Sequence, residues 1–288
     1  MKKTLVITGS TSGIGYELVK YFALRGDKVI AIARNKELIT QCTNNIKKIN
    51  PNVDLHFVYA NLAKLYDIRT ASGEIKSILG NEGLDVLINN AATVPNKKVI
   101  TEDGFEMQYQ VNYLSGVYFT KLLQEKINES KGIIITTTSR MHIMASFQKN
   151  NIMATKYYHM IRLYCRTKLY NLLFTLAYNH HVAPSTNTKA YAVHPGLVNT
   201  GIGTKSTRKL FASIWKYFAK KGRNPEDIVK TYCYIVDNHS TIDYDSYYFH
   251  DMEVAIPHKR LVTMKHAQLL WDMTNSQLNV CYSQNFCM

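Results

Sequence analysis

The fold is decided by the stretch Thr8-Gly9-Ser10-Thr11-Ser12-Gly13-Ile14-Gly15, which follows the first apolar run of the chain and leads into a stretch of helical periodicity. Gly9 allows a tight turn, Gly13 lets the backbone approach a pyrophosphate, and Gly15 lets the helix pack closely on the strand. The helix N-terminus then offers free N–H groups and the positive end of its dipole to phosphate oxygens. The stretch predicts a dinucleotide-binding turn with cofactor contacts from Gly9, Ser10, Thr11, Ser12, Gly13, Ile14 and Gly15.

Short apolar runs alternate with amphipathic stretches along the chain, which indicates βαβ units around a parallel sheet. We expect strands at Leu5–Thr8, Val29–Ala33, Leu55–Tyr59, Val86–Ile88, Ile133–Ile135 and Ala190–Val193. We expect helices within Tyr16–Leu24, Lys36–Ile49, Gly104–Ile127 and Thr155–Tyr178. The predicted fold class is α/β, a Rossmann-type doubly wound, mostly parallel sheet with helices on both faces. Ligands of such sheets bind at the carboxyl ends of the strands.

Size and composition agree with one domain spanning residues 1–288. The 288 residues are 46% apolar and 19% charged, which predicts a sizeable core. No linker-like or repeated segment divides the sequence.

The formal net charge of +14 raises the question of an anionic partner. Because the basic residues are spread along the chain without a nucleic-acid motif, we interpret them as a solubilising surface and expect no nucleic-acid partner.

Cysteine and histidine spacing gives no sign of a metal site. The five Cys contain no CxxC pair and the ten His contain no HExxH motif. The odd number of cysteines favours a reducing compartment. The sequence contains no signal-peptide pattern and no apolar window long enough for a membrane span. We therefore expect a cytoplasmic protein without a metal ion.

The end of the second predicted strand bears on the choice of cofactor. An acidic residue there would bind the ribose hydroxyls of NAD. This chain instead has Ala33-Arg34-Asn35, and the Arg34 guanidinium suits bidentate pairing with a 2′-phosphate. The alternative is an exposed arginine that merely opens a helix. The sequence favours NADP(H) over NAD, with Arg34 and Asn35 as cofactor contacts.

A tyrosine and a lysine one helical turn apart form the candidate acid/base pair. Tyr164 and Lys168 lie on one face of a predicted helix. A free tyrosine titrates near ~10, which is too high for efficient proton transfer near neutrality. A neighbouring ammonium and an oxidised nicotinamide would favour the phenolate. The spacing alone is weak in a chain with 20 Tyr.

Together these motifs resemble the short-chain dehydrogenase/reductase family, over essentially the whole chain. The glycine spacing is that of the dehydrogenase-type members, and further segments match at Asn89–Ala92, Asn112, Ser139 and His194–Thr200. The resemblance implies a catalytic set of Asn112, Ser139, Tyr164 and Lys168. By this resemblance, Tyr164 exchanges the proton with the substrate, and Lys168 lowers the pKa of Tyr164 and binds the nicotinamide ribose. Ser139 holds the substrate oxygen, and Asn112 anchors a water in the proton relay.

The resemblance also implies further cofactor contacts and shows two departures. The implied contacts are Asn61, Leu62, Asn90, Ala91, Ala92, Tyr164, Lys168, Pro195, Gly196, Val198 and Thr200. Asn61 stands where the family usually has an Asp, and its amide oxygen can still accept a hydrogen bond from adenine. Ala92 replaces a Gly, which lowers affinity if the backbone there needs positive φ.

Several features resemble the retinol dehydrogenase-like branch of the family. Ser139 precedes Tyr164 by 25 positions, a longer interval than in many members, and is followed by His142. The run Ala267–Asp272 also has a counterpart in that branch. The branch often uses NADP(H), in agreement with Arg34. The resemblance implies hydride transfer between NADP(H) and an apolar carbonyl or alcohol of retinoid, steroid or lipid type.

The basic amphipathic segment 205–223 is expected to cover the substrate pocket. By resemblance, residues 1–200 form the cofactor-binding and catalytic core, and residues 201–288 form the lid and C-terminal part. A membrane-surface helix remains the alternative for 205–223, although membrane contact is not expected. A homo-oligomer is left open. The alternative to an enzyme is a catalytically weak dinucleotide-binding interaction or sensor protein.

Overall fold

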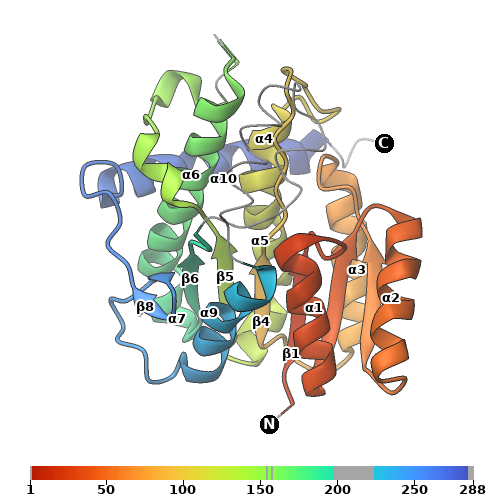
Figure 1. The fold of residues 1–288 in the computed structure, drawn as a ribbon. Coiled ribbons are helices and arrows are strands. Elements are labelled where there is room, and N and C mark those ends of the chain that lie inside the picture. Colours follow the sequence, from red (N-terminus) through yellow and green to blue (C-terminus); the bar gives the residue numbers. More distant parts are fainter. Residues whose placement is uncertain (1, 154, 157, 197–223, 285–288) are drawn as a thin grey trace.

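The computed structural model describes residues 2–153, 155–156, 158–196 and 224–284, and in them eight strands form one continuous sheet (Figure 1). The strand order is β3-β2-β1-β4-β5-β6-β7-β8, and only β8 runs antiparallel to its neighbour. The strands are β1 (Thr4–Thr8), β2 (Lys28–Ala33), β3 (Leu55–Tyr59), β4 (Val86–Asn89), β5 (Ile133–Thr137), β6 (Lys189–Val193), β7 (Tyr248–His250) and β8 (Glu253–Val254). The direction of winding reverses between β1 and β4, which is where a doubly wound sheet binds its ligand.

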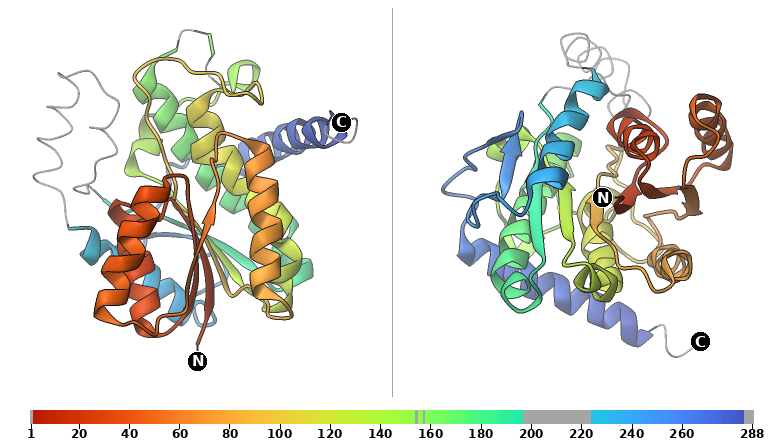
Figure 2. Two further views of the ribbon diagram at one scale, coloured as in Figure 1. Left: turned by 90° about the vertical axis from the view of Figure 1, so that its right-hand side faces the viewer. Right: turned by 90° about the horizontal axis from the view of Figure 1, so that it is seen from below.

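Helices cover both faces of the sheet, and the chain therefore has three layers (Figure 2). One face carries α1 (Gly13–Arg25), α2 (Lys36–Ile49) and α9 (Pro225–Asn238), and the other carries α3 (Leu65–Leu79), α5 (Ser115–Glu129) and α6 (Met160–His181). The helix α10 (Met264–Gln284) packs against α6 on the outside of the second layer. Shorter elements are α4 (Met107–Tyr109), the π-helical turn η1 (Gln110–Leu114), the 3₁₀ turns η2 (Arg140–Met144) and η3 (Lys149–Asn151), and α7 (Ala183–Thr186).

The central strands are buried on both faces, which explains their continuous apolar sequences. In β1 the side chains of Leu5 and Ile7 belong to the core beneath α1 and α9, whereas Val6 belongs to the core beneath α3, α5 and α6. All three side chains are fully buried. Successive side chains of a strand point to opposite faces, so apolar residues are required at every position.

All six predicted strands are confirmed, and Lys36–Ile49 has the predicted bounds. Two predicted helices begin too early. The stretch predicted from Gly104 is not helical at its start, because Gly104 has φ +80. It becomes helical only at Met107, in the short elements α4 and η1. The stretch predicted from Thr155 becomes helical only at Met160, after the His159 side chain accepts a hydrogen bond from Arg162 N–H. Strands β7 and β8 and helices α3, α9 and α10 were not predicted.

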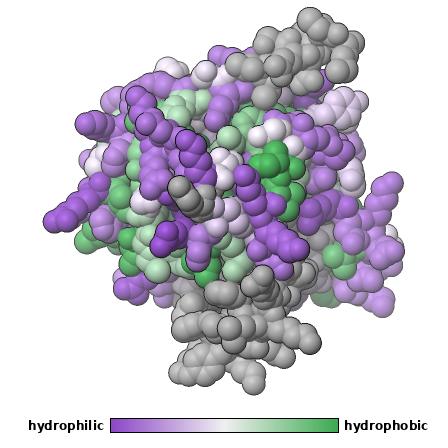
Figure 3. Space-filling view, turned by 90° about the horizontal axis from the view of Figure 1, so that it is seen from above, coloured by the Kyte–Doolittle hydropathy of each residue, from purple (hydrophilic) through white to green (hydrophobic). Residues whose placement is uncertain are grey.

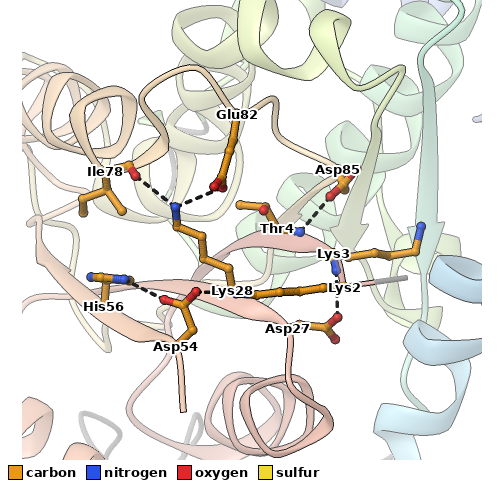
Figure 4. A network of polar contacts seen from close by, with 10 residues as sticks. All are labelled: Lys2, Lys3, Thr4, Asp27, Lys28, Asp54, His56, Ile78, Glu82 and Asp85. Atoms are coloured by element: carbon orange, nitrogen blue, oxygen red, sulfur yellow. Dashed lines mark hydrogen bonds and ion pairs between the residues drawn. The ribbon is translucent and has the colours of Figure 1, made fainter. Parts of the chain in front are cut away.

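Ion pairs and backbone hydrogen bonds secure the amino ends of strands β1 to β4 (Figure 4). Asp27 accepts a hydrogen bond from Lys3 N–H at 2.9 Å, and Asp85 accepts one from Thr4 N–H at 2.7 Å. Burial opposes ionisation of Asp54. Hydrogen bonds with Lys2 and His56 outweigh this effect and lower the pKa of Asp54. This network fixes where β1 begins.

Candidate active site

The loops after β1 and β4 are fastened together at the switch point of the sheet. The Thr8 hydroxyl accepts hydrogen bonds from the N–H groups of Asn90 at 3.0 Å and Ala91 at 3.1 Å. In return, Asn90 Nδ2 donates to the Thr8 carbonyl oxygen at 3.0 Å. The two loops that would flank a dinucleotide therefore form one unit.

The glycine turn needs glycine at three positions, of which Gly13 has φ +57. Gly9 has φ +68, and a Cβ there would lie 2.8 Å from Ala91 Cα. A Cβ on Gly15 would lie 2.1 Å from the Gly9 carbonyl oxygen. Ser12 precedes α1 without capping it through its side chain, so the N–H groups of the first turn are the donors that a pyrophosphate would take. Ser10, which follows Gly9, is fully buried, and its hydroxyl donates to the Ile32 carbonyl oxygen at 2.7 Å.

The predicted adenosine-side residues lie at the carboxyl ends of β2 and β3. Arg34 is exposed directly after β2, and within the described residues its guanidinium has no hydrogen bond or ion pair. Asn35 caps α2, because its side chain accepts a hydrogen bond from Leu38 N–H at 2.9 Å. Asn61 Oδ1 accepts from Ala63 N–H at 3.2 Å, and Leu62 is buried. An amide oxygen has a second lone pair for another donor.

Helix α6 brings the candidate tyrosine and lysine to the end of β5. The Ser139 side chain lies near enough to Tyr164 to favour ionisation of its hydroxyl, and Ser139 also caps η2 by accepting from Met141 N–H at 3.2 Å. Lys168 Nζ lies 5.6 Å from the centroid of the Tyr164 ring. The structure thus brings together three of the four predicted catalytic residues, although Ser139 and Tyr164 are far apart in sequence.

The end of β5 is bound to α6 by three hydrogen bonds. Lys168 Nζ donates to the Thr137 carbonyl oxygen at 2.9 Å, and Asn171 Nδ2 donates to the same oxygen at 3.1 Å. The Thr138 hydroxyl donates to the Lys168 carbonyl oxygen at 2.7 Å. These contacts hold Ser139, the next residue, at a fixed distance from the helix.

Burial shifts the pKa of the tyrosine and that of the lysine, each in the direction that favours the neutral form of that side chain. Burial raises the pKa of Tyr164 to about 12, and the nearby Ser139 side chain acts in the opposite direction. Burial also lowers the pKa of Lys168 to about 8. The tyrosine is therefore protonated at neutral pH and able to donate a proton. An added positive charge beside it would make proton loss easier.

Asn112 lies in the π-helical turn η1, a conformation that occurs frequently at functional sites. Its Oδ1 accepts a hydrogen bond from Thr93 N–H at 2.7 Å, and its Nδ2 donates to the Thr93 carbonyl oxygen at 3.0 Å. The same Nδ2 lies 3.3 Å from the Thr167 hydroxyl oxygen. The side chain therefore ties the loop after β4 to α6.

The remaining predicted contacts follow β4 and β6. Ala92 is half-buried and does not have positive φ, so the methyl group causes no backbone strain there. Pro195 and Gly196 follow β6 after one intervening residue, at the same edge as Ser139. Val198, Thr200 and the segment 205–223 lie outside the described residues.

Sequence reasoning missed the polar groups that hold the site together. These are the Thr8 hydroxyl, the backbone groups of Thr93 and Thr137, and the Asn171 amide. Backbone acceptors leave no trace in side-chain patterns. Asn171 could have been found, because it follows Lys168 by three positions on the same helical face.

Comparison with known proteins identifies the class. The model of the short chain dehydrogenase family matches residues 3–210. Human retinol dehydrogenase 13 is 29% identical over 279 residues, covering 93% of this chain and 82% of the relative. Human retinol dehydrogenase 11 is 30% identical over 276 residues, covering 94% and 84%. The chain belongs to the short-chain dehydrogenase/reductase family. Within that family it belongs to the retinol dehydrogenase-like branch, and it is an oxidoreductase of alcohols or carbonyls.

Solved structures agree on the fold. L-sorbose reductase from Gluconobacter frateurii, complexed with NADPH and L-sorbose, has a TM-score of 0.68 at 19% identity, covering 87% of this chain and 95% of its own. A short chain dehydrogenase/reductase from Burkholderia phymatum, in complex with NAD, has a TM-score of 0.68 at 13% identity, covering 86% and 88%. Their cofactors are both nicotinamide dinucleotides, of different kinds.

Within the described part of the chain, no helix has the length and apolar character needed to cross a membrane. No group of three or more His, Cys, Asp or Glu side chains suited to a metal ion occurs among the same residues.

Above the carboxyl ends of the strands, the visible face is mostly hydrophilic, with small hydrophobic groups between the hydrophilic residues (Figure 3).

Proposed function

We propose that the protein is an NADP(H)-dependent oxidoreductase that transfers hydride between the nicotinamide and an apolar carbonyl or alcohol. The observation that carries this proposal is the position of Tyr164 beside the Ser139 side chain, with Lys168 Nζ 5.6 Å from the centroid of the Tyr164 ring. These groups lie at the same edge of the sheet as the glycine turn at the switch point.

A bound nicotinamide supplies the hydride in carbonyl reduction and accepts it in alcohol oxidation. In reduction, the Tyr164 hydroxyl donates its proton to the substrate oxygen, and in oxidation the phenolate takes it back. Ser139 holds that oxygen by a hydrogen bond as negative charge develops on it. Lys168 stabilises the phenolate and binds the nicotinamide ribose. Asn112 keeps the loop at Thr93 against the site and anchors a relay water.

The preference for NADP(H) rests on Arg34. Its guanidinium is exposed and has no partner among the described residues, so it is free to bind a 2′-phosphate as a bidentate donor. The tripeptide Ala33-Arg34-Asn35 has no carboxylate to bind the free ribose hydroxyls or to repel a phosphate.

Two observations support an apolar substrate. The similar human proteins are named retinol dehydrogenases. In η2, which Ser139 caps, Ile143 and Met144 are 45% and 69% exposed. Apolar side chains next to the substrate-oxygen site can provide contact area to a hydrocarbon chain or ring.

The test is a substrate panel followed by nicotinamide absorbance with NADP(H) and NAD(H). It should include retinoid, steroid and long-chain aldehydes or ketones, the matching alcohols, and small hydrophilic carbonyls. We expect turnover of the apolar members with NADP(H). Tight dinucleotide binding without turnover of any member would instead support the sensor alternative.

A further inference from the structure

Two histidine rings are stacked behind the turn that follows β6. His194 directly follows β6, and His250 ends the neighbouring strand β7. Their ring centroids are 4.1 Å apart and their planes differ by 4°. The stack lies directly before Pro195 and Gly196, which were predicted to contact the nicotinamide side of the cofactor.

Hydrogen bonds determine the role of each Nδ1 atom. His194 Nδ1 accepts from Gly196 N–H at 2.9 Å, so this nitrogen carries no proton. His250 Nδ1 lies 2.9 Å from the His194 carbonyl oxygen, and since a carbonyl can only accept, His250 Nδ1 carries the proton. Burial lowers the pKa of His194 to about 4, with His250 adding to the effect. The His194 ring therefore remains an acceptor at neutral pH.

The His250 ring is held on three sides. One face lies on His194, Nδ1 binds the His194 carbonyl, and Nε2 lies 3.5 Å from the Asp251 carboxylate. A Cβ placed on Gly196, which has φ +76, would lie 3.2 Å from His250 Cε1. The His250 ring thus lies close against the turn and restricts the movement of its backbone.

We propose that His250 is a positioning residue that fixes the turn His194–Gly196 and, through it, the nicotinamide end of the bound cofactor. This inference rests on the proposed function for its cofactor. His250 needs no contact with the cofactor itself. The stack and the hydrogen bond to the His194 carbonyl set the orientation of the peptide groups around Pro195.

Three substitutions separate the ring stack of His250 from its Nδ1 hydrogen bond. His250→Ala removes both the stack and the donor, His250→Phe keeps a ring without the donor, and His250→Asn keeps a side-chain N–H donor. Thr231→Val is the matched control, because the Thr231 hydroxyl accepts a hydrogen bond from Met252 N–H in the same β7–β8 hairpin. It loosens the hairpin without changing His250.

The readouts are the Kd for NADPH, the KM for NADPH against kcat, and the stereospecificity of hydride transfer from NADPH deuterated at either face of C4. We expect His250→Ala to raise the Kd and KM for NADPH roughly tenfold and to lower stereospecificity. His250→Asn should recover most of the loss and His250→Phe part of it. Thr231→Val should lower the unfolding midpoint without changing the Kd.

The outcomes distinguish this inference from the proposed function. If the wild-type protein binds NADPH but His250→Ala has an unchanged Kd and stereospecificity, His250 has no positioning role. If Thr231→Val reproduces the His250→Ala losses, the effect is hairpin instability and the inference fails. If the wild-type protein binds no dinucleotide, the proposed function fails and this inference fails with it.

Discussion

Lys168 Nζ donates a 2.9 Å hydrogen bond to the carbonyl oxygen of Thr137, the last residue of β5. The ammonium is therefore anchored to the strand that leads to Ser139, while its own helix carries Tyr164. Lys168 is 2% exposed, and burial of such a group without an ionic partner is costly unless it is hydrogen-bonded. This one contact links the positions of all three side chains.

Tyr164→Phe removes the hydroxyl and keeps the ring. Because the proposed general acid is lost, kcat should fall by roughly 10²–10⁴, whereas the Kd for NADPH and the unfolding midpoint should change little. Tyr66→Phe, at a tyrosine that is 64% exposed, is the control. Near wild-type kcat in Tyr164→Phe would exclude this residue as the proton donor.

Arg34→Ala should weaken NADPH binding and leave NADH binding nearly unchanged. Loss of a charge-assisted contact to the 2′-phosphate corresponds to roughly tenfold to a hundredfold in Kd. Lys36→Ala removes a nearby exposed positive charge and controls for long-range attraction. Equal losses for both dinucleotides in a titration would show that Arg34 acts only structurally.

Gly9→Ala should abolish dinucleotide binding and lower stability, because φ is +68 and the new Cβ would lie 2.8 Å from Ala91 Cα. Gly73→Ala is the matched control. A Cβ at Gly73, inside α3, has no atom within 4 Å, so it should stabilise the helix by up to ~1 kcal/mol. Thermal unfolding and NADPH titration of both variants measure the difference. Intact binding in Gly9→Ala would contradict the tight-turn role.

Glu106 should make stability fall as pH rises. Its side chain is fully buried, accepts hydrogen bonds from Gln108 N–H and Tyr109 N–H, and burial raises its pKa from 4.5 to about 7. Between these values the folded protein binds the proton more strongly than the unfolded chain. Stability therefore declines from about pH 4.5 to about pH 7, by on the order of 1–3 kcal/mol.

Glu106→Gln keeps an oxygen acceptor and removes the ionisation. Urea unfolding at pH 5 and pH 8 should show that the variant lacks this part of the decline. Glu74→Gln, at an exposed position of α3, should keep the wild-type pH dependence. The same pH dependence in Glu106→Gln as in the wild type would mean that Glu106 ionises normally in the folded protein.

Local sequence determined six of the strands, several helices and the choice of candidate site residues. The glycine turn, the buried strands and the Tyr164/Lys168 spacing depend on residues within one turn or strand of each other, where side-chain periodicity and backbone sterics suffice. The short strands β7 and β8 escaped prediction, because three and two residues are too few to show a period.

Tertiary structure decided which of these pieces meet. Strand order places the loop after β4 beside the turn after β1, so that Thr8 binds the backbone of Asn90 and Ala91. It also brings His250 onto His194 from a strand 56 positions later in sequence. Such contacts depend on strand neighbours and on backbone acceptors, and neither is encoded in the spacing of side chains along the chain.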